Sequence, residues 1–223
     1  MHTKLEDFPV QATPPLTLRE LEPAARGEAA RLLGRGMCDN PVKLQAFRIP
    51  DGERRSQALA RFFVPVLDGL GKRGLILGAF RNTTLVGVYG AAPPGRCQHT
   101  PWQKLRVFPS LVSGNPLRTP FQVLRWTGEW ARRDLTEPHW HLGPVAVDAP
   151  LRGRGIGGAM MAEFCARMDH GRALSYLEPD RAENVRFYQR FGFVVIAEAR
   201  VLGVPNWFMS RPAAPAAAGS RSV

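Results

Sequence analysis

One stretch of the chain, residues 141–168, constrains the fold more than any other part of the sequence. Apolar residues 145–147 predict a buried strand, residues 152–158 contain four glycines, and an amphipathic helix follows up to Met168. Glycine leaves backbone N–H groups open to an approaching anion, and a helix N-terminus carries roughly half a positive charge. The stretch therefore predicts a phosphate-binding loop between a strand and a helix.

Two familiar phosphate loops are alternatives for this stretch. A Walker A loop requires a lysine followed by serine or threonine, and residues 152–158 contain no lysine. A dinucleotide-binding fingerprint requires an acidic residue about 20 residues further on. Glu178 lies near that distance, so spacing alone does not settle the choice.

The order of the residues adds a more specific signal. Arg152, Gly155 and Gly157 resemble the Gln/Arg-x-x-Gly-x-Gly/Ala loop that binds the acyl-CoA pyrophosphate in the GNAT N-acetyltransferase superfamily. A second match lies downstream, where a strand ends at Glu178, the next helix carries Tyr188, and Gly-Phe opens another strand. The two motifs occur in order and about 30 residues apart, as one helix and one strand require.

The resemblance covers roughly residues 140–211, whereas the first half of the chain matches only in the order of its elements. It implies an α/β GNAT fold, with a central mixed, mostly antiparallel sheet flanked by helices. In that fold two splayed parallel strands form the acyl-CoA cleft. Gly143-Pro144 lies inside the first of them, and because proline cannot donate to a ladder, it predicts a bulge or an unpaired point.

Periodicity and turn residues predict the remaining elements. Strands are expected at residues 16–21, 75–80, 85–89, 140–147, 174–178, 193–201 and 206–209. Helices are expected at residues 24–33, 42–47, 56–70, 102–107, 120–133, 159–167 and 183–190. Gly34 and Gly36 are expected to end the first helix, and Pro65 to kink the third.

These elements predict a single GNAT domain over residues 16–211. Residues 1–15 are expected to form a flexible arm, and the Ala/Pro/Gly/Ser-rich residues 212–223 a disordered tail. A minimal GNAT fold passes almost directly from its third strand to its fourth. Residues 91–135 therefore predict an insertion, which the resemblance places over the acceptor side.

Composition limits the other function classes. The net charge is +11, from 30 Lys+Arg against 19 Asp+Glu, which fits either a solvated basic surface or attraction to anions such as CoA phosphates. Acidic and basic residues alternate without a like-charge run, which makes nucleic acid an unlikely partner. No apolar run approaches the roughly 20 residues of a membrane span, and the N-terminus does not read as a secretory signal.

The three cysteines, Cys38, Cys97 and Cys165, match neither a zinc spacing nor a disulfide framework. A cytoplasmic protein with no resident metal is the expectation. The cysteines also lack a His/Asp context of the catalytic kind, so no covalent acyl-cysteine is expected. A homodimer stays open.

The resemblance also implies which residues bind acetyl-CoA. The backbone of Val145, Ala146 and Val147 is expected to bind the pantetheine arm and to polarise the thioester carbonyl. The expected phosphate loop comprises Arg152, Gly153, Arg154, Gly155, Ile156, Gly157 and Gly158. Its two arginines either contact phosphate or point to water. Asn184 either binds the cofactor or caps its helix, because the usual family position for the asparagine is Arg181 here.

Catalytic roles follow in the same way. Tyr188 is expected to contact the cofactor and to protonate the departing CoA thiolate. Its three-residue spacing with Val185 and Phe191 also fits a helix face that packs into the core. Glu178 matches the catalytic glutamate of some members, and His141 and His139, on one face of their strand, are alternative bases. Many members use ordered water instead.

The resemblance thus implies an N-acetyltransferase that moves an acetyl group from acetyl-CoA to a primary amine by direct attack in a ternary complex. The acceptor is open among a small molecule, an antibiotic, a polyamine and a protein amine, and the positive charge weakly disfavours a polycation. A non-catalytic acyl-CoA-binding or regulatory module of the same fold is the alternative. Charge-driven nucleic-acid binding is a third hypothesis.

Overall fold

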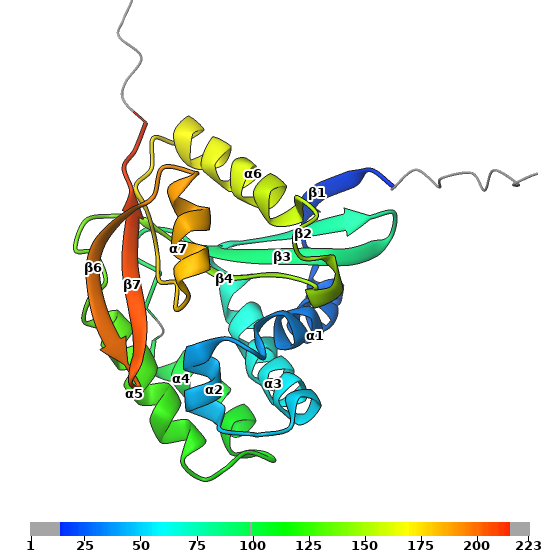
Figure 1. Cartoon of the computed structure of the whole chain (residues 1–223), viewed down its shortest axis with the longest axis vertical. Helices are drawn as coiled ribbons and strands as arrows, with labels where there is room; N and C mark the ends of the chain where they lie inside the picture. Colours follow the sequence, from blue (N-terminus) through cyan, green and yellow to red (C-terminus); the bar gives the residue numbers. More distant parts are fainter. Residues whose placement is uncertain (1–13, 99, 215–223) are drawn as a thin grey trace, which may run out of the picture.

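A seven-stranded sheet forms the centre of the molecule (Figure 1). The computed structural model describes residues 14–98 and 100–214. The strands lie in the order β1-β2-β3-β4-β5-β7-β6, and every pair is antiparallel except the parallel β4–β5 pair. Their bounds are β1 Leu16–Glu20, β2 Leu75–Arg81, β3 Thr84–Ala92, β4 Trp140–Val147, β5 Ser175–Leu177, β6 Val194–Val201 and β7 Val204–Arg211. The predicted mixed, mostly antiparallel sheet is confirmed.

Helices cover both faces of this sheet. Their bounds are α1 Arg26–Met37, α2 Pro41–Phe47, α3 Gly52–Leu70, α4 Pro101–Val112, α5 Thr119–Ala131, α6 Ile156–His170 and α7 Ala182–Gln189, with short 3-10 turns at Pro23–Ala25 and Ala149–Leu151. Figure 1 shows α6 and α7 on one side and α1–α5 on the other. Two apolar cores follow from this arrangement, one on each face.

The first helix does not end where the sequence predicted. Gly34 and Gly36 lie inside α1, which continues to Met37, so the prediction that they terminate it is wrong. A Cβ on Gly34 would overlap the carbonyl oxygen of Ser56 on α3, and one on Gly36 would lie 2.8 Å from Ala146 Cβ on β4. The two glycines therefore serve close packing of α1 against its neighbours.

The third helix begins earlier than expected, at Gly52 rather than near residue 56. Asp51 caps it, because its Oδ1 accepts a hydrogen bond of 2.7 Å from the backbone N–H of Arg54. Leu59, Phe62 and Phe63 lie on its buried side, as their spacing predicted.

The segment between β3 and β4 contains the two predicted helices. The first, α4, is longer than expected and begins with a capping box at Thr100 and Gln103. That this segment is an insertion over the acceptor side stays a prediction, and residues 1–13 and 215–223, where most of the arm and tail were expected, lie outside the described residues.

The parallel pair of strands separates soon after it forms. β4 and β5 pair only at Trp140–Ser175 and His141–Tyr176. The predicted bulge is also present, because Tyr89 and Ala91 of β3 pair with Val145 and Leu142, which leaves one extra residue on β4 at Gly143-Pro144. The predicted cleft between two splayed strands is therefore confirmed.

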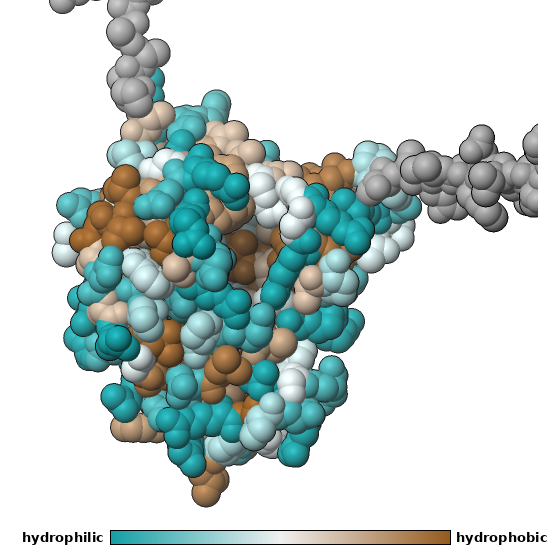
Figure 2. All heavy atoms as spheres, viewed as in Figure 1, coloured by the Kyte–Doolittle hydropathy of each residue, from teal (hydrophilic) through white to brown (hydrophobic). Residues whose placement is uncertain are grey.

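The surface carries a few apolar patches (Figure 2). On this face hydrophobic side chains gather over β6, where Val194 and Ile196 are 53% and 46% exposed, and others are recessed near the centre. Within the described ranges, no helix combines the length and the apolar character that a membrane crossing demands.

The glycine contacts in α1 generate a stability prediction. Gly34→Ala should lower the free energy of unfolding by about 1–3 kcal/mol, because the added methyl meets backbone atoms of α3 and outweighs the helix propensity gained. Gly69→Ala in α3 is the matched control, since its Cβ meets no atom within 4 Å, and it should raise stability by up to about 1 kcal/mol. Urea unfolding measures both, and equal shifts of the two variants would contradict the packing role.

Candidate active site

The glycine-rich loop between β4 and α6 presents its backbone amides to solvent. Gly153 and Gly155 have φ of +76° and +79°, in the left-handed region that other residues rarely adopt, and Gly155 is the N-cap of α6. Within residues 14–98 and 100–214, no oxygen accepts a hydrogen bond from the N–H groups of residues 153–158, and Ala159 is the first to donate, to Gly155 O at 3.0 Å. The loop can therefore bind an anion through fixed donors at a helix N-terminus.

The two loop arginines behave differently. The Arg152 guanidinium forms an ion pair with Asp39 at 3.1 Å and donates to the carbonyl oxygen of Gly36, which ties the loop to the end of α1. Burial of Asp39 favours its neutral form, but the nearby guanidinium groups outweigh this and lower its pKa. Arg154 is exposed and has no ion pair in the described part of the chain, so it is the arginine available to a ligand.

The bulge on β4 decides which amides face the cleft. The N–H of Trp140 donates to Leu174 O toward β5, whereas the N–H of Asp148 donates to Val86 O on β3. Amide directions alternate along a strand, and the extra residue at the bulge shifts that alternation by one. The N–H groups of Val145 and Val147 therefore point toward the separated β5 side, whereas Ala146, which pairs with Val88, directs its N–H toward β3 and away from the cleft.

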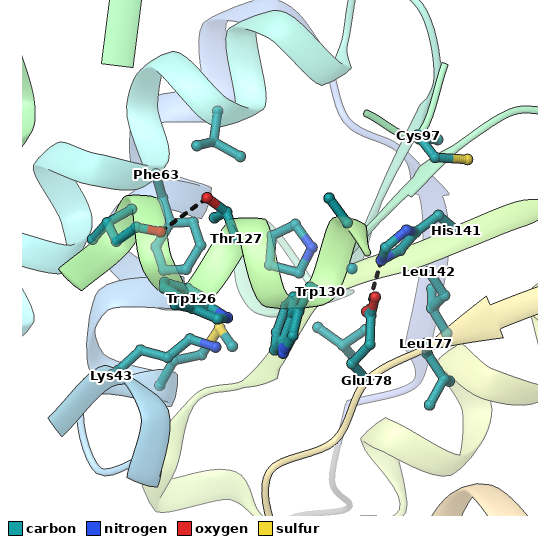
Figure 3. Close-up of a pocket in the computed structure, with 18 of the residues that line it drawn as sticks. Lys43, Phe63, Cys97, Trp126, Thr127, Trp130, His141, Leu142, Leu177 and Glu178 are labelled. Atoms are coloured by element: carbon teal, nitrogen blue, oxygen red, sulfur yellow. Dashed lines mark hydrogen bonds and ion pairs between the residues drawn. The ribbon is translucent and has the colours of Figure 1, made fainter. Parts of the chain in front are cut away.

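A cavity of about 310 Å³ opens where the strands separate. It is lined from one face of the sheet by α7 and from the other by α3, α4 and α5, with β4 and the end of β5 between them. Figure 3 shows His141 and Glu178 at one side of it, Lys43 and Trp126 at the other, and Trp130 between them.

Glu178 and His141, predicted separately as alternative bases, form a pair in the structure. Glu178 follows β5, its side chain is 2% exposed, and its Oε2 lies 2.8 Å from His141 Nε2. Burial disfavours the charged imidazole, but Glu178 outweighs this and raises the pKa of His141. The second carboxylate oxygen, Oε1, has no hydrogen-bond partner among the residues that the structure describes.

Tyr188 lines the same cavity from α7. Its ring packs edge-on against Phe187 and Phe193 at centroid distances of 5.3 and 5.9 Å, so it also contributes to the core, as the alternative interpretation held. Burial raises the pKa of its phenol, which keeps the proton on the oxygen. The group can therefore act as a hydrogen-bond donor or an acid.

Asn184 lines the cavity but does not cap its helix. The N-cap of α7 is Arg181, whose guanidinium donates to the carbonyl oxygen of Asp39. Asn184 lies three residues inside, so the capping interpretation is wrong. It lies on the cavity wall, where its amide can reach a ligand.

Lys43 is a cavity residue that the sequence did not single out. It is 4% exposed, and its ammonium lies 4.4 Å from the ring centre of Trp126 and 5.2 Å from that of Trp130. In the described part of the chain no carboxylate lies within 4.0 Å of it. Burial lowers its pKa, against the smaller effects of Asp180 and Glu178. The only signal in the sequence was a lysine among the apolar residues of a short helix.

The expectation that the cysteines lack a His/Asp context is wrong for Cys97. One donor atom from each of Cys97, His139 and His141 lies within 4.8 Å of the others. His139 Nε2 lies 3.0 Å from Asp134 Oδ1, and although burial opposes the charge, this contact raises the pKa of His139 to about 10. The cluster could not be recognised from the sequence, because Cys97 and His139 are 42 residues apart.

Comparison with known proteins identifies the fold. The model of the acetyltransferase (GNAT) family matches residues 46–193. Histone acetyltransferase HPA2 and related acetyltransferase from Corynebacterium glutamicum superposes with a TM-score of 0.68 at 24% identity, over 91% of this chain and 99% of that one.

Two further structures agree. The Drosophila melanogaster polyamine N-acetyltransferase gives a TM-score of 0.60 at 16% identity, over 89% of this chain and 100% of that one. The PaiA N-acetyltransferase of Thermoplasma acidophilum, in complex with coenzyme A, gives 0.54 at 12% identity, over 89% and 99%. These identities show a shared fold.

The environment of Lys43 generates a pH-dependent prediction. Because its folded pKa is below the roughly 10.4 of an unfolded lysine, the unfolded chain binds more protons just below that pH, and stability rises there. The wild type should therefore gain stability relative to Lys43→Met as pH rises toward about 10.4. At neutral pH the variant should be at least as stable as the wild type.

Urea unfolding across this pH range measures the difference. Lys72→Met, which removes an exposed lysine, is the matched control and should follow the wild type throughout. A constant difference between the wild type and Lys43→Met would contradict the account of Lys43.

Proposed function

Because the chain belongs to the acetyltransferase (GNAT) family, we propose that it transfers an acetyl group from acetyl-CoA to a primary amine bound in the cavity. One observation carries the proposal. The free amides of β4 lead from the glycine loop to a cavity that also contains Tyr188 and the Glu178–His141 pair. Groups suited to bind phosphate, to polarise a thioester and to transfer protons thus lie along β4, in the loop that follows it and in the cavity.

The chain offers donors suited to the pyrophosphate, the pantetheine arm and the thioester of acetyl-CoA. The N–H groups of residues 153–158 suit the pyrophosphate, with Arg154 as a flexible additional cation. The N–H groups of Val145 and Val147 suit the pantetheine arm and the thioester carbonyl, on which negative charge develops during attack. Support for CoA as the partner comes from the family and from the Thermoplasma structure, which contains coenzyme A.

The proposed reaction needs three proton transfers. The incoming ammonium loses a proton to Glu178, whose Oε1 is free and whose negative charge is stabilised by His141. The amine nitrogen then bonds to the thioester carbon, the cationic nitrogen of this adduct loses a second proton to water, and the C–S bond breaks. The CoA sulfur leaves as a thiolate, and Tyr188 supplies its proton. No covalent enzyme intermediate forms on this route.

The cavity favours a small amine with an apolar body as the acceptor. Its walls include Phe62, Phe63, Trp126 and Trp130, which provide apolar contact area. Lys43 adds a positive charge on the side away from Glu178, where a second cation on the substrate would be repelled. We therefore rank an apolar monoamine above a polyamine.

The role of Tyr188 generates the test of the proposed function. Tyr188→Phe should lower kcat by about 10²–10⁴-fold, because the phenol proton is lost, and should leave CoA affinity nearly unchanged. Release of CoA thiol with a panel of amines measures kcat, and calorimetry measures affinity. The matched control is Tyr89→Phe, a fully buried tyrosine of the same apolar core that does not line the cavity, which should keep full turnover. Undiminished kcat in Tyr188→Phe would rule out the acid role, and a wild type that binds CoA without turnover would indicate a non-catalytic module.

The glycine loop generates a binding prediction. Gly155→Ala should weaken CoA binding by at least about 10-fold, because an L-residue at φ +79° shifts the backbone donors. Gly203→Ala in the β6–β7 turn is the matched control. It introduces the same strain at φ +82°, with open space around it, and should leave CoA affinity unchanged. Calorimetric titration separates the two, and equal affinities would contradict the assignment of the loop.

A further inference from the structure

A cluster of metal-ligating side chains lies beside the acceptor cavity. Cys97 follows β3, His139 precedes β4, and His141 lies on β4. One donor atom from each lies within 4.8 Å of the others. Tetrahedral zinc bonds of about 2.0–2.3 Å place neighbouring ligand atoms about 3.5 Å apart, so a closure of roughly 1 Å would complete the site. Figure 3 shows Cys97 beside His141 at the end of the cavity opposite Lys43.

The two imidazole rings already have the hydrogen bonds typical of metal ligands. His139 Nδ1 lies 2.8 Å from the carbonyl oxygen of Glu137, and His141 Nε2 lies 2.8 Å from Glu178. A metal-bound histidine almost always donates its other N–H to a carboxylate or a carbonyl in this way. The pattern leaves His139 Nε2 and His141 Nδ1 as the ligating atoms.

Those two nitrogens are buried and lack hydrogen-bond partners among the described residues. His139 itself is only 4% exposed. Its Nε2 has an ion-pair contact with Asp134 at 3.0 Å, but without hydrogen-bond geometry. Unpartnered buried polar atoms are costly, and a cation between them and the Cys97 sulfur would satisfy both.

We propose that Cys97, His139 and His141 bind a divalent transition metal of the zinc type. One thiolate and two neutral imidazoles suit zinc, and Asp134 and Glu178 provide further negative charge nearby. Cys97 and His141 also line the cavity, so a fourth coordination position can face it. Ion entry then requires loss of the thiol and imidazole protons, a closure of roughly 1 Å, and displacement of the contact between His139 Nε2 and Asp134.

This site would join the beginning and the end of the segment between β3 and β4. Cys97 precedes α4 and the two histidines follow α5, so the metal would fix both helices over the cavity. It would also keep His141 Nε2–H directed at Glu178. The site therefore goes beyond the proposed acetyl transfer, and its test needs no acetyltransferase assay.

The experiment is a titration of the untagged full chain with Co²⁺, followed by absorption, after treatment with a chelator. We expect one equivalent per chain, a thiolate-to-cobalt charge-transfer band, and displacement of cobalt by Zn²⁺. Cys97→Ser should abolish the charge-transfer band. It should also weaken cobalt affinity by more than the about 10–100-fold that is typical when a residue hydrogen-bonded to a metal ligand is lost. His139→Gln should weaken affinity without removing a thiolate. Cys38→Ser is the matched control and should behave as the wild type, because Cys38 lies outside the cluster.

Two results would overturn the proposal. One is the absence of cobalt binding to the wild type at millimolar concentration. The other is an unchanged band in Cys97→Ser. A urea midpoint for each variant shows that it is folded, and CoA affinity, measured on the same samples, shows whether the proposed acetyl-CoA site is intact independently of the metal site.

Discussion

The separation of β4 from β5 is the constraint on which the rest of the structure depends. Pairing stops after His141, and the extra residue at Gly143-Pro144 redirects the amide alternation of β4. Backbone donors in a sheet interior are normally consumed by the neighbouring strand. Here the N–H groups of Val145 and Val147 have no partner strand among those that the structure describes. The interrupted pairing therefore leaves a row of fixed hydrogen-bond donors that leads to the glycine loop.

The same separation allows both layers of helices to reach one cavity. Elsewhere the sheet keeps the two apolar cores apart, but at the gap α7 from one face and α3–α5 from the other line a common space. Tyr188 therefore lies opposite Trp126 and Lys43, with the Glu178–His141 pair between the two layers. The two walls of the cavity therefore come from different parts of the chain.

The sequence predicted those parts of the site that are formed by residues close together in the chain. The loop around Gly155 and the interrupted strand before it are local patterns, and their geometry follows from φ preferences and strand alternation. Glu178 and His141 could be placed near each other because neighbouring strands carry them, although their direct pairing was not foreseen. Lys43 could not be placed, because its surroundings come from helices distant in the sequence. The misread Gly34 shows the same limit, since a glycine that ends a helix and one that admits a neighbouring backbone look alike without the neighbour.

The central claim is that the open amides of β4 and the glycine loop together bind acyl-CoA. Amide hydrogen exchange of the full chain, with and without coenzyme A, tests it most directly, because it reports on these N–H groups themselves. The account predicts that CoA slows exchange at Val145 and Val147 and at residues 153–158, while β6 and β7 exchange as before. Unchanged exchange in both segments at saturating CoA, or protection confined to another part of the molecule, would contradict it.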